Sequence, residues 1–329
     1  MSGIRFEDLS KGQVIGSDPL AVTREDIVAF ARAYDPQPFH LDEAAARETF
    51  VGTLIASGWH TAALAMRLLQ ASVFRGGSSM GSPGITELRW VRPVLPGDAL
   101  RLSVKVEDCR RSTSKPDRGF VRLAMAVLNQ RGETVMSQGC TVMLPRRGAE
   151  SPPPRPVALA EPVPAAEPED AEILPFLSRA EIGATRELGA HAFTADAIVA
   201  FARAYDPQVF HLDPAAARET HFGGLCASGW HTAAIWMRRM LATRARDAAL
   251  TARSGPVPAS GPSPGFRDLR WLKPVYAGDT IAYATTLIDR RASATRPGWG
   301  LSTSRNTGRN QHGEPVFEFT SSVFWQWAA

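Results

Sequence analysis

The sequence predicts an α+β protein built from two tandem copies of one module, because two phrases recur at a common spacing. "YDPQPFHLD" at 34–42 returns as "YDPQVFHLD" at 205–213, and "ASGWHTAA" stands at both 56–63 and 227–234. Both recurrences have an offset of 171 residues, which indicates an internal duplication. A chain of 329 residues also has the length of two ordinary domains.

A Pro-rich segment separates the two copies. From about 146 to 172 the apolar periodicity disappears, and Pro, Ala and Glu dominate. Such a composition favours an extended chain without a core of its own. We therefore divide the chain into an N-terminal module over 1–147, a linker over 148–172 and a C-terminal module over 173–329.

Each module is expected to begin with an amphipathic helix that ends at an Asp-Pro pair. In the first module Thr23 is the expected N-cap, and Asp26 completes a variant of the capping box. Proline disfavours helical geometry in the residue before it, so the helices should end at 35–36 and 206–207. Apolar residues share one face of each helix, at Ile27, Phe30, Ala31 and Tyr34 and at Ile198, Phe201, Ala202 and Tyr205. The repeated phrase therefore lies on a loop just after a helix.

A second, longer helix and a run of strands follow in each module. The helix is predicted from Ser57 and Gly58 to about Phe74, and its apolar residues surround the axis, as in a buried helix. "GITELRWVRPVLPGD" then matches "GFRDLRWLKPVYAGD" at an offset of 181, and further strands are expected around 120–129 and 134–144. The second module has therefore gained ten residues, which we expect in a longer surface loop within 242–264.

A long buried helix with an antiparallel sheet wrapped around it is the α+β arrangement called a hotdog fold. A single module of this kind exposes a sheet edge and one flank of its helix, and pairing of two modules covers both. We therefore predict two tandem hotdog modules that form a pseudo-dimeric double hotdog within one chain. Further association into homo-oligomers stays open.

Composition excludes several classes of partner and compartment. The net charge of +4 is far from the dense basic surface of a nucleic-acid-binding protein. The most apolar stretch, at 54–74, is interrupted by polar residues, so no membrane span and no membrane partner are expected. The first twenty residues lack the pattern of a signal peptide. Three cysteines without a metal or redox spacing indicate buried thiols, and we expect a cytoplasmic protein.

The repeated loop carries the candidate catalytic residues. Asp35 and His40 stand five positions apart in module 1, and Asp206 and His211 repeat the pair in module 2. A histidine is the usual side chain for proton transfer near neutral pH, and a nearby carboxylate can hold the same water molecule. The position of Pro38 in the first loop is taken by Val209 in the second, so the second loop is expected to be the less rigid one.

The start of the long helix carries a candidate binding site for an oxygen atom. The first N–H groups of a helix have no internal partner and lie at the positive end of its dipole. Gly58 and Gly229 would let a ligand approach these groups, and they are assigned to substrate binding together with the neighbouring Ser57 and Ser228. An N–H at this place is suited to polarising a carbonyl group.

Purely structural interpretations compete with these assignments. An Asp-Pro pair is a common helix stop, and a Ser-Gly pair is an ordinary N-cap. His60 and His231, which follow a tryptophan on the helix, are interpreted as structural, and no ligand spacing supports a zinc site with His40. The joint recurrence of Asp, His and helix-start Gly in both modules favours function, without a metal.

At these residues the chain resembles the MaoC-like dehydratases, which include the (R)-specific enoyl-CoA hydratases. Their Asp-x-Asn-Pro-x-His-x-Asp signature stands here at 35–42 with Gln37 in place of Asn, and at 206–213 with Gln208 and Val209. The resemblance covers both modules but not the linker. The serine that the family commonly has deeper in the central helix is replaced by Met66 and Met237.

The resemblance implies reversible hydration of a trans-2-enoyl-CoA to a (3R)-hydroxyacyl-CoA. The Asp and His of each module would activate water, and Gly58 and Gly229 would bind the thioester oxygen. Coenzyme A would be part of the substrate, with no separate cofactor, and a short or medium acyl chain is favoured. Two alternatives stay open: a hotdog acyl-CoA thioesterase, and a non-catalytic acyl-CoA-binding protein.

Overall fold

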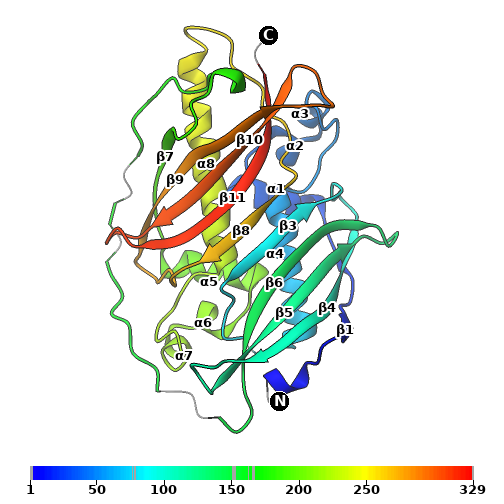
Figure 1. The fold of residues 1–329 in the computed structure, drawn as a ribbon, viewed down its shortest axis with the longest axis vertical. Helices are drawn as coiled ribbons and strands as arrows, with labels where there is room; N and C mark the ends of the chain where they lie inside the picture. Colours follow the sequence, from blue (N-terminus) through cyan, green and yellow to red (C-terminus); the bar gives the residue numbers. More distant parts are fainter. Residues whose placement is uncertain are drawn as a thin grey trace.

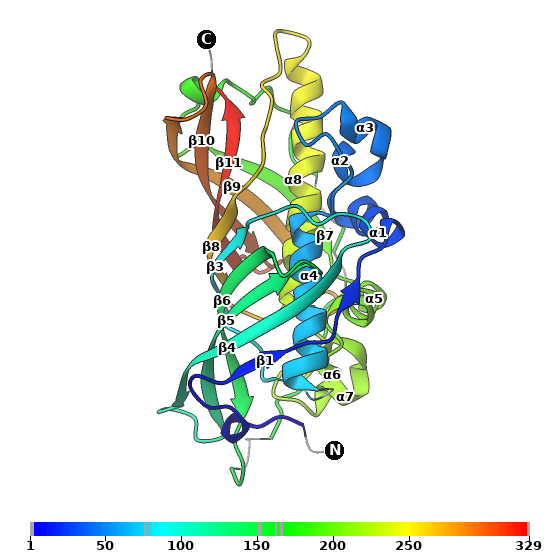
Figure 2. The same cartoon turned by 90° about the vertical axis from the view of Figure 1, so that its right-hand side faces the viewer.

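One curved antiparallel sheet, covered on one face by helices, forms the computed structural model of the chain (Figures 1 and 2). The structure describes residues 3–75, 77, 79–149, 153–161, 163–164 and 167–327. The sheet has eleven strands in the order β1-β4-β5-β6-β3-β8-β11-β10-β9-β7, with β2 paired to β4. Strands β1 to β6 belong to module 1 and β7 to β11 to module 2, so the sheet passes without a break from one module to the other. The predicted α+β double hotdog is confirmed.

The two modules contain the same elements in nearly the same order. Module 1 consists of η1 (Phe6–Asp8), β1 (Val14–Gly16), β2 (Leu20–Ala21), α1 (Arg24–Tyr34), α2 (Pro38–Leu41), α3 (Glu43–Arg47), α4 (Gly58–Leu69), η2 (Gln70–Phe74), β3 (Gly84–Trp90), β4 (Ala99–Arg111), β5 (Arg118–Leu128) and β6 (Thr134–Pro145). Module 2 consists of η3 (Leu177–Arg179), β7 (Thr185–Ala192), α5 (Ala195–Tyr205), α6 (Val209–Leu212), α7 (Pro214–Arg218), α8 (Gly229–Thr251), β8 (Gly265–Trp271), β9 (Thr280–Ala292), β10 (Trp299–Arg309) and β11 (Pro315–Gln326).

Strands β3 and β8 join the modules edge to edge. They pair antiparallel, with Gly84 opposite Arg270 and Arg89 opposite Gly265. A Cβ atom on either glycine would lie about 2 Å from a carbonyl oxygen of the facing strand, and both glycines have a positive φ. Only glycine fits these two places, because the backbones approach too closely for a side chain.

The predicted helix starts and ends of α1 and α5 are confirmed. Thr23 caps α1 with its hydroxyl, and Asp26 completes the capping box. Thr194 caps α5 in the same way, by accepting from the N–H of Ala197. Both helices end at the residue before the aspartate of the repeated loop, so the loop starts from a fixed direction.

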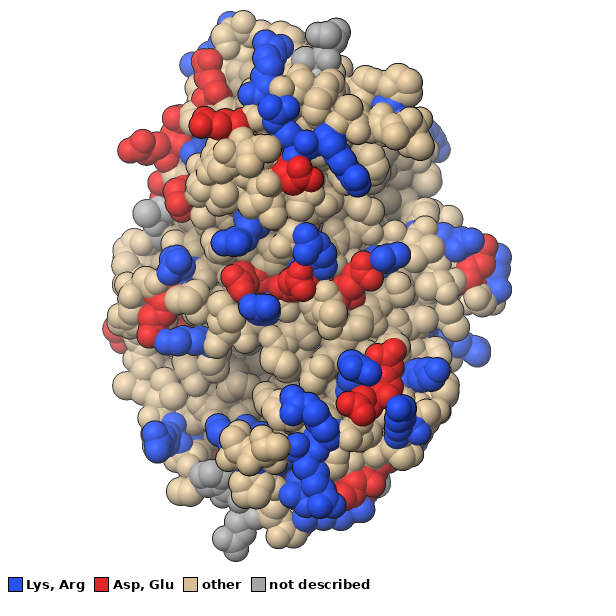
Figure 3. Space-filling model, viewed as in Figure 1, with Lys and Arg blue, Asp and Glu red and all other residues tan. Residues whose placement is uncertain are grey.

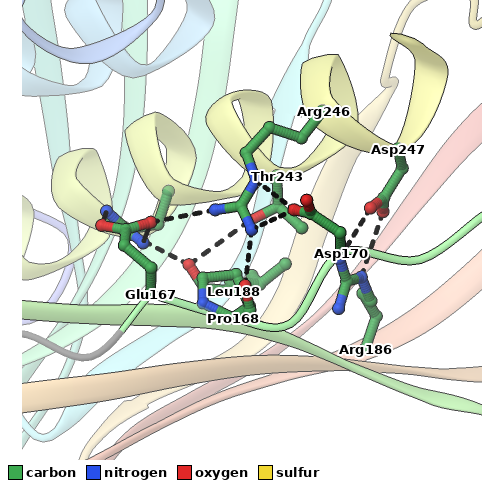
Figure 4. A network of polar contacts seen from close by, with 9 residues as sticks. Glu167, Pro168, Asp170, Arg186, Leu188, Thr243, Arg246 and Asp247 are labelled. Atoms are coloured by element: carbon green, nitrogen blue, oxygen red, sulfur yellow. Dashed lines mark hydrogen bonds and ion pairs between the residues drawn. The ribbon is translucent and has the colours of Figure 1, made fainter. Parts of the chain in front are cut away.

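The ten additional residues of module 2 do not form only the surface loop that was expected within 242–264. Helix α8 continues to Thr251, so the loop within 242–264 begins only at 252. The stretch is rich in Ala, Arg and Leu, which favour helix. Its outer turns are also held by ion pairs of Arg246 with Asp170 and of Asp247 with Arg186, both at 2.6 Å (Figure 4). The first portion of the expected surface loop is therefore a continuation of the helix.

The described residues of the linker run extended along module 2 and contain no helix or strand. Glu167 forms an ion pair with Arg246 of α8 (Figure 4). It forms a second ion pair with Arg239 of the same helix. Nearer to module 1, the N–H of Val157 donates to the carbonyl of Gly223 at 3.1 Å. The linker therefore contacts the module that follows it, while its limits at 148 and 172 stay a prediction.

The described residues include no helix that is both long and apolar enough to cross a membrane. The outer face of the sheet carries Lys and Arg intermixed with Asp and Glu, and neither sign forms a continuous surface in that view (Figure 3). This distribution agrees with the modest net charge of +4.

Candidate active sites at the ends of α1 and α5

Asp35 and Asp206 occupy the C-caps of α1 and α5. The N–H of Asp35 still donates to the carbonyl of Ala31 at 2.9 Å, and that of Asp206 donates to Ala202 at 2.9 Å. Their φ and ψ then leave the helical region, which turns the chain out of the helix. Both carboxylates are buried, with 2% and 3% of the residue exposed. A buried carboxylate needs hydrogen-bond donors, and side chains of the same module supply them here.

The donors are a serine and a glutamine of the same module. Ser57 donates to Asp35 Oδ2 at 2.6 Å, and Gln37 donates to Oδ1 at 2.9 Å. The Ser57 hydroxyl also accepts from the N–H of Trp59, so it caps α4 as well. In module 2, Ser228 and Gln208 donate to the Asp206 carboxylate at 2.7 and 3.0 Å.

Sequence reasoning gave the serines a different role and gave the glutamines none. Ser57 and Ser228 were expected to bind substrate, and in the structure their contacts are with the aspartates and with the helix they cap. Substrate binding by the serines stays a prediction. The glutamines hold the second oxygen of each aspartate, which the signature position of Gln37 and Gln208 alone did not indicate.

His40 lies on the short helix α2 and faces Asp35. Its Nδ1 is 2.8 Å from the carbonyl oxygen of Ile55. A carbonyl only accepts, so Nδ1 carries the proton of a neutral ring and Nε2 presents its lone pair. The distance from Nε2 to Asp35 Oδ2 is 3.5 Å, which is long for a direct hydrogen bond but suits two groups that contact one water molecule.

His211 repeats this geometry in module 2. Its Nδ1 is 2.6 Å from the carbonyl oxygen of Cys226, and its Nε2 is 3.5 Å from Asp206 Oδ2. Burial lowers the pKa of His211, and this effect exceeds the opposing effects of the Asp206 carboxylate and the Cys226 carbonyl. The ring is therefore neutral near pH 7 and suited to accepting a proton at Nε2.

Gly58 and Gly229 begin the central helices next to these pairs. Neither N–H has a hydrogen-bond acceptor among the residues that the structure describes. The indole of Trp90 packs against Gly58, where a Cβ would lie 2.4 Å from the ring, and Trp271 packs against Gly229 at 2.2 Å. The structure thus gives a second reason for glycine here: the tryptophan of the repeated Leu-Arg-Trp needs the space.

Each Asp–His pair opens into a cavity whose wall belongs to the other module. Cavity 1, of about 470 Å³, contains Asp35, His40 and Gly58, and is closed by α8 and the inner face of β8 to β11. Cavity 2, of about 320 Å³, contains Asp206, His211 and Gly229, and is closed by residues of α4, η2, β3 and β6. Along the long axis of the molecule, α2 and α3 accordingly lie at the level of the module 2 sheet, and α6 and α7 lie at the level of the module 1 sheet (Figures 1 and 2). The chemistry of one module therefore meets a substrate pocket built by its neighbour, which the sequence did not indicate.

His60 and His231 lie away from the cavities, among aromatic rings. His60 stacks on Phe30 at 4.7 Å and His231 stacks on Phe201 at 4.6 Å. Burial lowers the pKa of His60 to about 4 and that of His231 to about 3. Within the described ranges, no cluster of three or more His, Cys, Asp or Glu residues is able to hold a metal ion. These two histidines therefore pack as neutral rings.

Proteins of known sequence are similar to one module or part of it, and solved structures are similar to the whole duplicated chain. The uncharacterised protein YdeM of Bacillus subtilis strain 168 is 27% identical over 143 residues, which are 44% of this chain and all of that protein. Mesaconyl-CoA hydratase of Cereibacter sphaeroides is 34% identical over 79 residues, 24% of this chain and 23% of the hydratase. A Chloroflexus aurantiacus J-10-fl protein assigned to the MaoC domain dehydratases superposes with a TM-score of 0.77 at 19% identity, over 99% of this chain and 98% of its own. A conserved hypothetical protein of Mycobacterium tuberculosis with a double hotdog fold gives 0.70 at 17% identity, over 98% of each chain.

The family model described as "MaoC like domain" matches this chain twice, at residues 6–123 and 178–297. The two matches cover most of the chain and include both Asp–His pairs, both helix-start glycines and the first strands of each module. The chain therefore belongs to the MaoC-like domain family and carries two copies of that domain.

Proposed function

We propose that the chain catalyses the reversible hydration of a trans-2-enoyl-CoA to a (3R)-hydroxyacyl-CoA. The observation that carries this proposal is the pairing of a carboxylate oxygen with a histidine nitrogen at 3.5 Å, in a cavity that also contains a helix-start N–H for which no described residue supplies an acceptor. Membership of a family described as dehydratases, with a mesaconyl-CoA hydratase among the relatives, supports the reaction class.

The residues of module 1 are assigned the following roles. The thioester oxygen accepts a hydrogen bond from the N–H of Gly58, which stabilises the enolate that forms when C3 is attacked. One water donates its protons toward Asp35 Oδ2 and His40 Nε2. Its oxygen bonds to C3 as one of these groups takes a proton, and the pair returns a proton to C2 on the same face. The net result is OH on C3 and H on C2.

Module 2 is assigned the same chemistry with Asp206, His211 and Gly229. Hydration changes no overall oxidation state, and the Asp–His pair supplies the base, so the proposal needs neither a redox cofactor nor a metal. Arg92 at cavity 1 and Lys273 at cavity 2 are exposed cations on the cavity walls, where the phosphates of coenzyme A would be attracted. Such a substrate and three free thiols fit a cytoplasmic location.

The test is an assay on a panel of trans-2-enoyl-CoA thioesters without added metal or redox cofactor. We expect loss of the enoyl-thioester absorbance and a (3R)-hydroxy product by chiral chromatography. An (S)-hydroxy product would contradict the assigned geometry. Release of free coenzyme A without a hydroxyacyl product would instead identify a thioesterase, and tight acyl-CoA binding without turnover would identify a binding protein.

A further inference from the structure

The inner wall of cavity 1 is polar at positions where the duplicated strands of module 1 carry apolar or thiol side chains. The strands of the two modules align at an offset of 181, and the paired registers of β5 with β6 and β10 with β11 agree with it. Five inward positions change from apolar or thiol side chains to hydroxyl or amide side chains. Val104, Val121, Leu123, Met125 and Cys140 in module 1 correspond to Thr285, Ser302, Ser304, Asn306 and Ser321 in module 2. All five polar residues line cavity 1.

Asn306 organises this polar wall. It is fully buried, accepts from the hydroxyl of Thr285 at 2.9 Å and donates to the hydroxyl of Ser321 at 3.0 Å. Its second donated bond, at 3.3 Å, goes to the carbonyl of Ser304. The amide is thus satisfied inside the protein, while the hydroxyl of Ser304 has no hydrogen bond to any described residue and Ser321 still has a proton to donate. The wall therefore offers donors to an occupant of the cavity.

Arg244 of α8 adds a positive charge to the same wall. Its guanidinium lies 4.8 Å from the ring centre of Trp325, and no carboxylate among the described residues lies within ion-pair distance of it. Burial lowers its pKa to about 10, so it remains protonated at neutral pH. The corresponding stretch of module 1 carries Val73 and Phe74, of which Phe74 lines cavity 2. Arg244 is half-buried, and a cation that has lost much of its water without gaining a counter-ion favours a ligand that supplies the anion.

Trp236 lies on α8 before Arg244, and it also offers a hydrogen-bond donor to a ligand. Its indole N–H is buried and has no hydrogen-bond acceptor among the described residues. It lines cavity 1 and packs beside Trp59, the neighbour of Gly58, so it lies near the reactive end. Arg244 follows eight residues later, roughly 12 Å further along the helix. The donors therefore extend from the reactive end to a charged far end.

We propose that cavity 1 selects enoyl thioesters whose acyl chain ends in a carboxylate, which Arg244 and the serines of the wall bind, while cavity 2 selects apolar acyl chains. This inference rests on the proposed hydration. A guanidinium recognises a carboxylate through two parallel charge-assisted hydrogen bonds. An alkyl end in cavity 1 would instead remove water from Arg244 without replacing it, which disfavours that substrate. Of the aligned positions, Cys140, Val142 and Gln138 line cavity 2, and Gln138, opposite Phe319, is the polar one among these three.

The experiment measures each site alone on matched substrates. The variant Asp206→Asn with His211→Ala leaves only site 1, and Asp35→Asn with His40→Ala leaves only site 2. Substrates are trans-2-hexenoyl-, octenoyl- and decenoyl-CoA and their ω-carboxylated analogues. We expect the protein with site 1 alone to have the higher kcat/KM for a carboxylated ester, and the protein with site 2 alone to prefer the alkyl ester.

Arg244→Met in the protein with site 1 alone is expected to lower kcat/KM for the preferred carboxylated ester by at least about 30-fold, the usual loss when a buried charge pair is broken. The alkyl ester of the same length should lose far less, so that the preference reverses. Arg305→Met is the matched control, because Arg305 lies on β10 next to Asn306 but is exposed on the outer face. It should leave the preference unchanged.

Several outcomes would overturn the proposal. A preference of site 1 for alkyl esters is one, and an equal loss on all thioesters in Arg244→Met is another, since it would place Arg244 against coenzyme A. If Arg244→Met does not fold by circular dichroism, Ser304→Leu, which introduces the residue of module 1, should lower turnover of the carboxylated ester more than that of the alkyl ester; equal effects would contradict the proposal.

Failure of the hydration itself is distinguishable. If neither site turns over any enoyl thioester, the proposed function is wrong, and calorimetry with saturated acyl-CoA and ω-carboxyacyl-CoA then tests the cavity. Weaker binding of only the carboxylated ester by Arg244→Met would support the charged pocket. Unchanged binding of both esters would overturn it.

Discussion

The catalytic loop of module 2 is held by more contacts than the loop of module 1, although the two sequences are nearly the same. The side chain of Gln208 accepts from the N–H and the hydroxyl of Ser79 at 3.0 and 2.8 Å, whereas the side chain of Gln37 has only Asp35 as a hydrogen-bond partner among the described residues. His221 contacts the carbonyl of Met80 at 3.0 Å, while Phe50 at the matching position is 48% exposed. The linker also contacts the second loop, through Val157 and Gly223.

This difference shows that a repeated sequence does not guarantee repeated surroundings. The replacement of the proline at 38 by Val209 had suggested a looser second loop. In the structure, the loop of module 2 is also contacted by Ser79 and Met80 of module 1 and by the linker. None of these contacts has a counterpart at the loop of module 1 among the described residues. Site 2 is thus the more tightly held site, and its cavity of about 320 Å³ is smaller than the 470 Å³ of cavity 1.

The largest expected effect comes from removing one or both Asp–His pairs. Asp35→Asn with His40→Ala should remove a share of the hydratase activity, and Asp206→Asn with His211→Ala another share, because each module keeps its own pair and N–H. The quadruple variant should lose at least about 10²-fold, the usual contribution of positioned acid–base groups. Initial rates on enoyl-CoA thioesters measure this.

Asp42→Asn is the control for that series. Asp42 caps α3 by accepting from the N–H of Ala45, and asparagine caps a helix equally well. Activity should therefore be retained. If one double variant alone abolished turnover on every substrate, the other site would be structural. Only one of the two modules would then be catalytic.

The next effect concerns stability at acid pH, through His60 and His231. Both rings are buried with lowered pKa values, about 4 and about 3, while an unfolded histidine titrates near 6.5. The unfolded state therefore binds protons first, and stability is lost as pH falls below about 6.5. At pH 5 each ring should contribute a loss of about 2 kcal/mol relative to pH 7.

Denaturant unfolding at pH 7 and pH 5 checks this for His60→Leu and His231→Leu. Each variant should show a smaller difference between the two pH values than the parent chain. The two variants should differ from each other only below about pH 4. There the folded protein protonates His60, whose pKa is about 4, before His231, whose pKa is about 3. An unchanged pH dependence in both variants would mean that other groups control acid unfolding.

A smaller effect should separate the two loops directly. Ser79→Ala removes the hydroxyl that donates to Gln208 and leaves that contact to a backbone N–H alone. With site 2 alone active, kcat/KM should fall up to about ten-fold, since a lost buried hydrogen bond costs roughly 1–1.5 kcal/mol. With site 1 alone active, the same substitution should have no effect. An equal loss at both sites would contradict the role of Ser79 in holding the loop of module 2.

The smallest effect is expected from cutting the linker near Pro153. The pairing of β3 with β8 and the shared cavities hold the modules together without it. Size-exclusion chromatography of the nicked protein under native conditions should show one species of unchanged volume. Two separate folded modules would contradict the pseudo-dimer.

Sequence reasoning reached the elements that short-range patterns control. The cap at Thr23, the stop at Asp35 and the start of the long helix at Gly58 follow from local residues, and all three are present. The longer α8 was missed, because a gap in an alignment reveals the number of added residues but not their conformation. The partners of Gln208 and the wall around Arg244 were missed too, because they come from segments far away in the chain.

The unbroken sheet across β3 and β8 has a consequence for how this protein can change. In a dimer of identical subunits, each substitution is made twice and alters both pockets together. Here one codon change reaches one pocket only, since the wall of cavity 1 and the wall of cavity 2 are encoded at different positions. Substitutions in one gene can therefore change the specificity of one pocket while the other pocket keeps its own. The contact surface between the modules, which both need to fold, is retained.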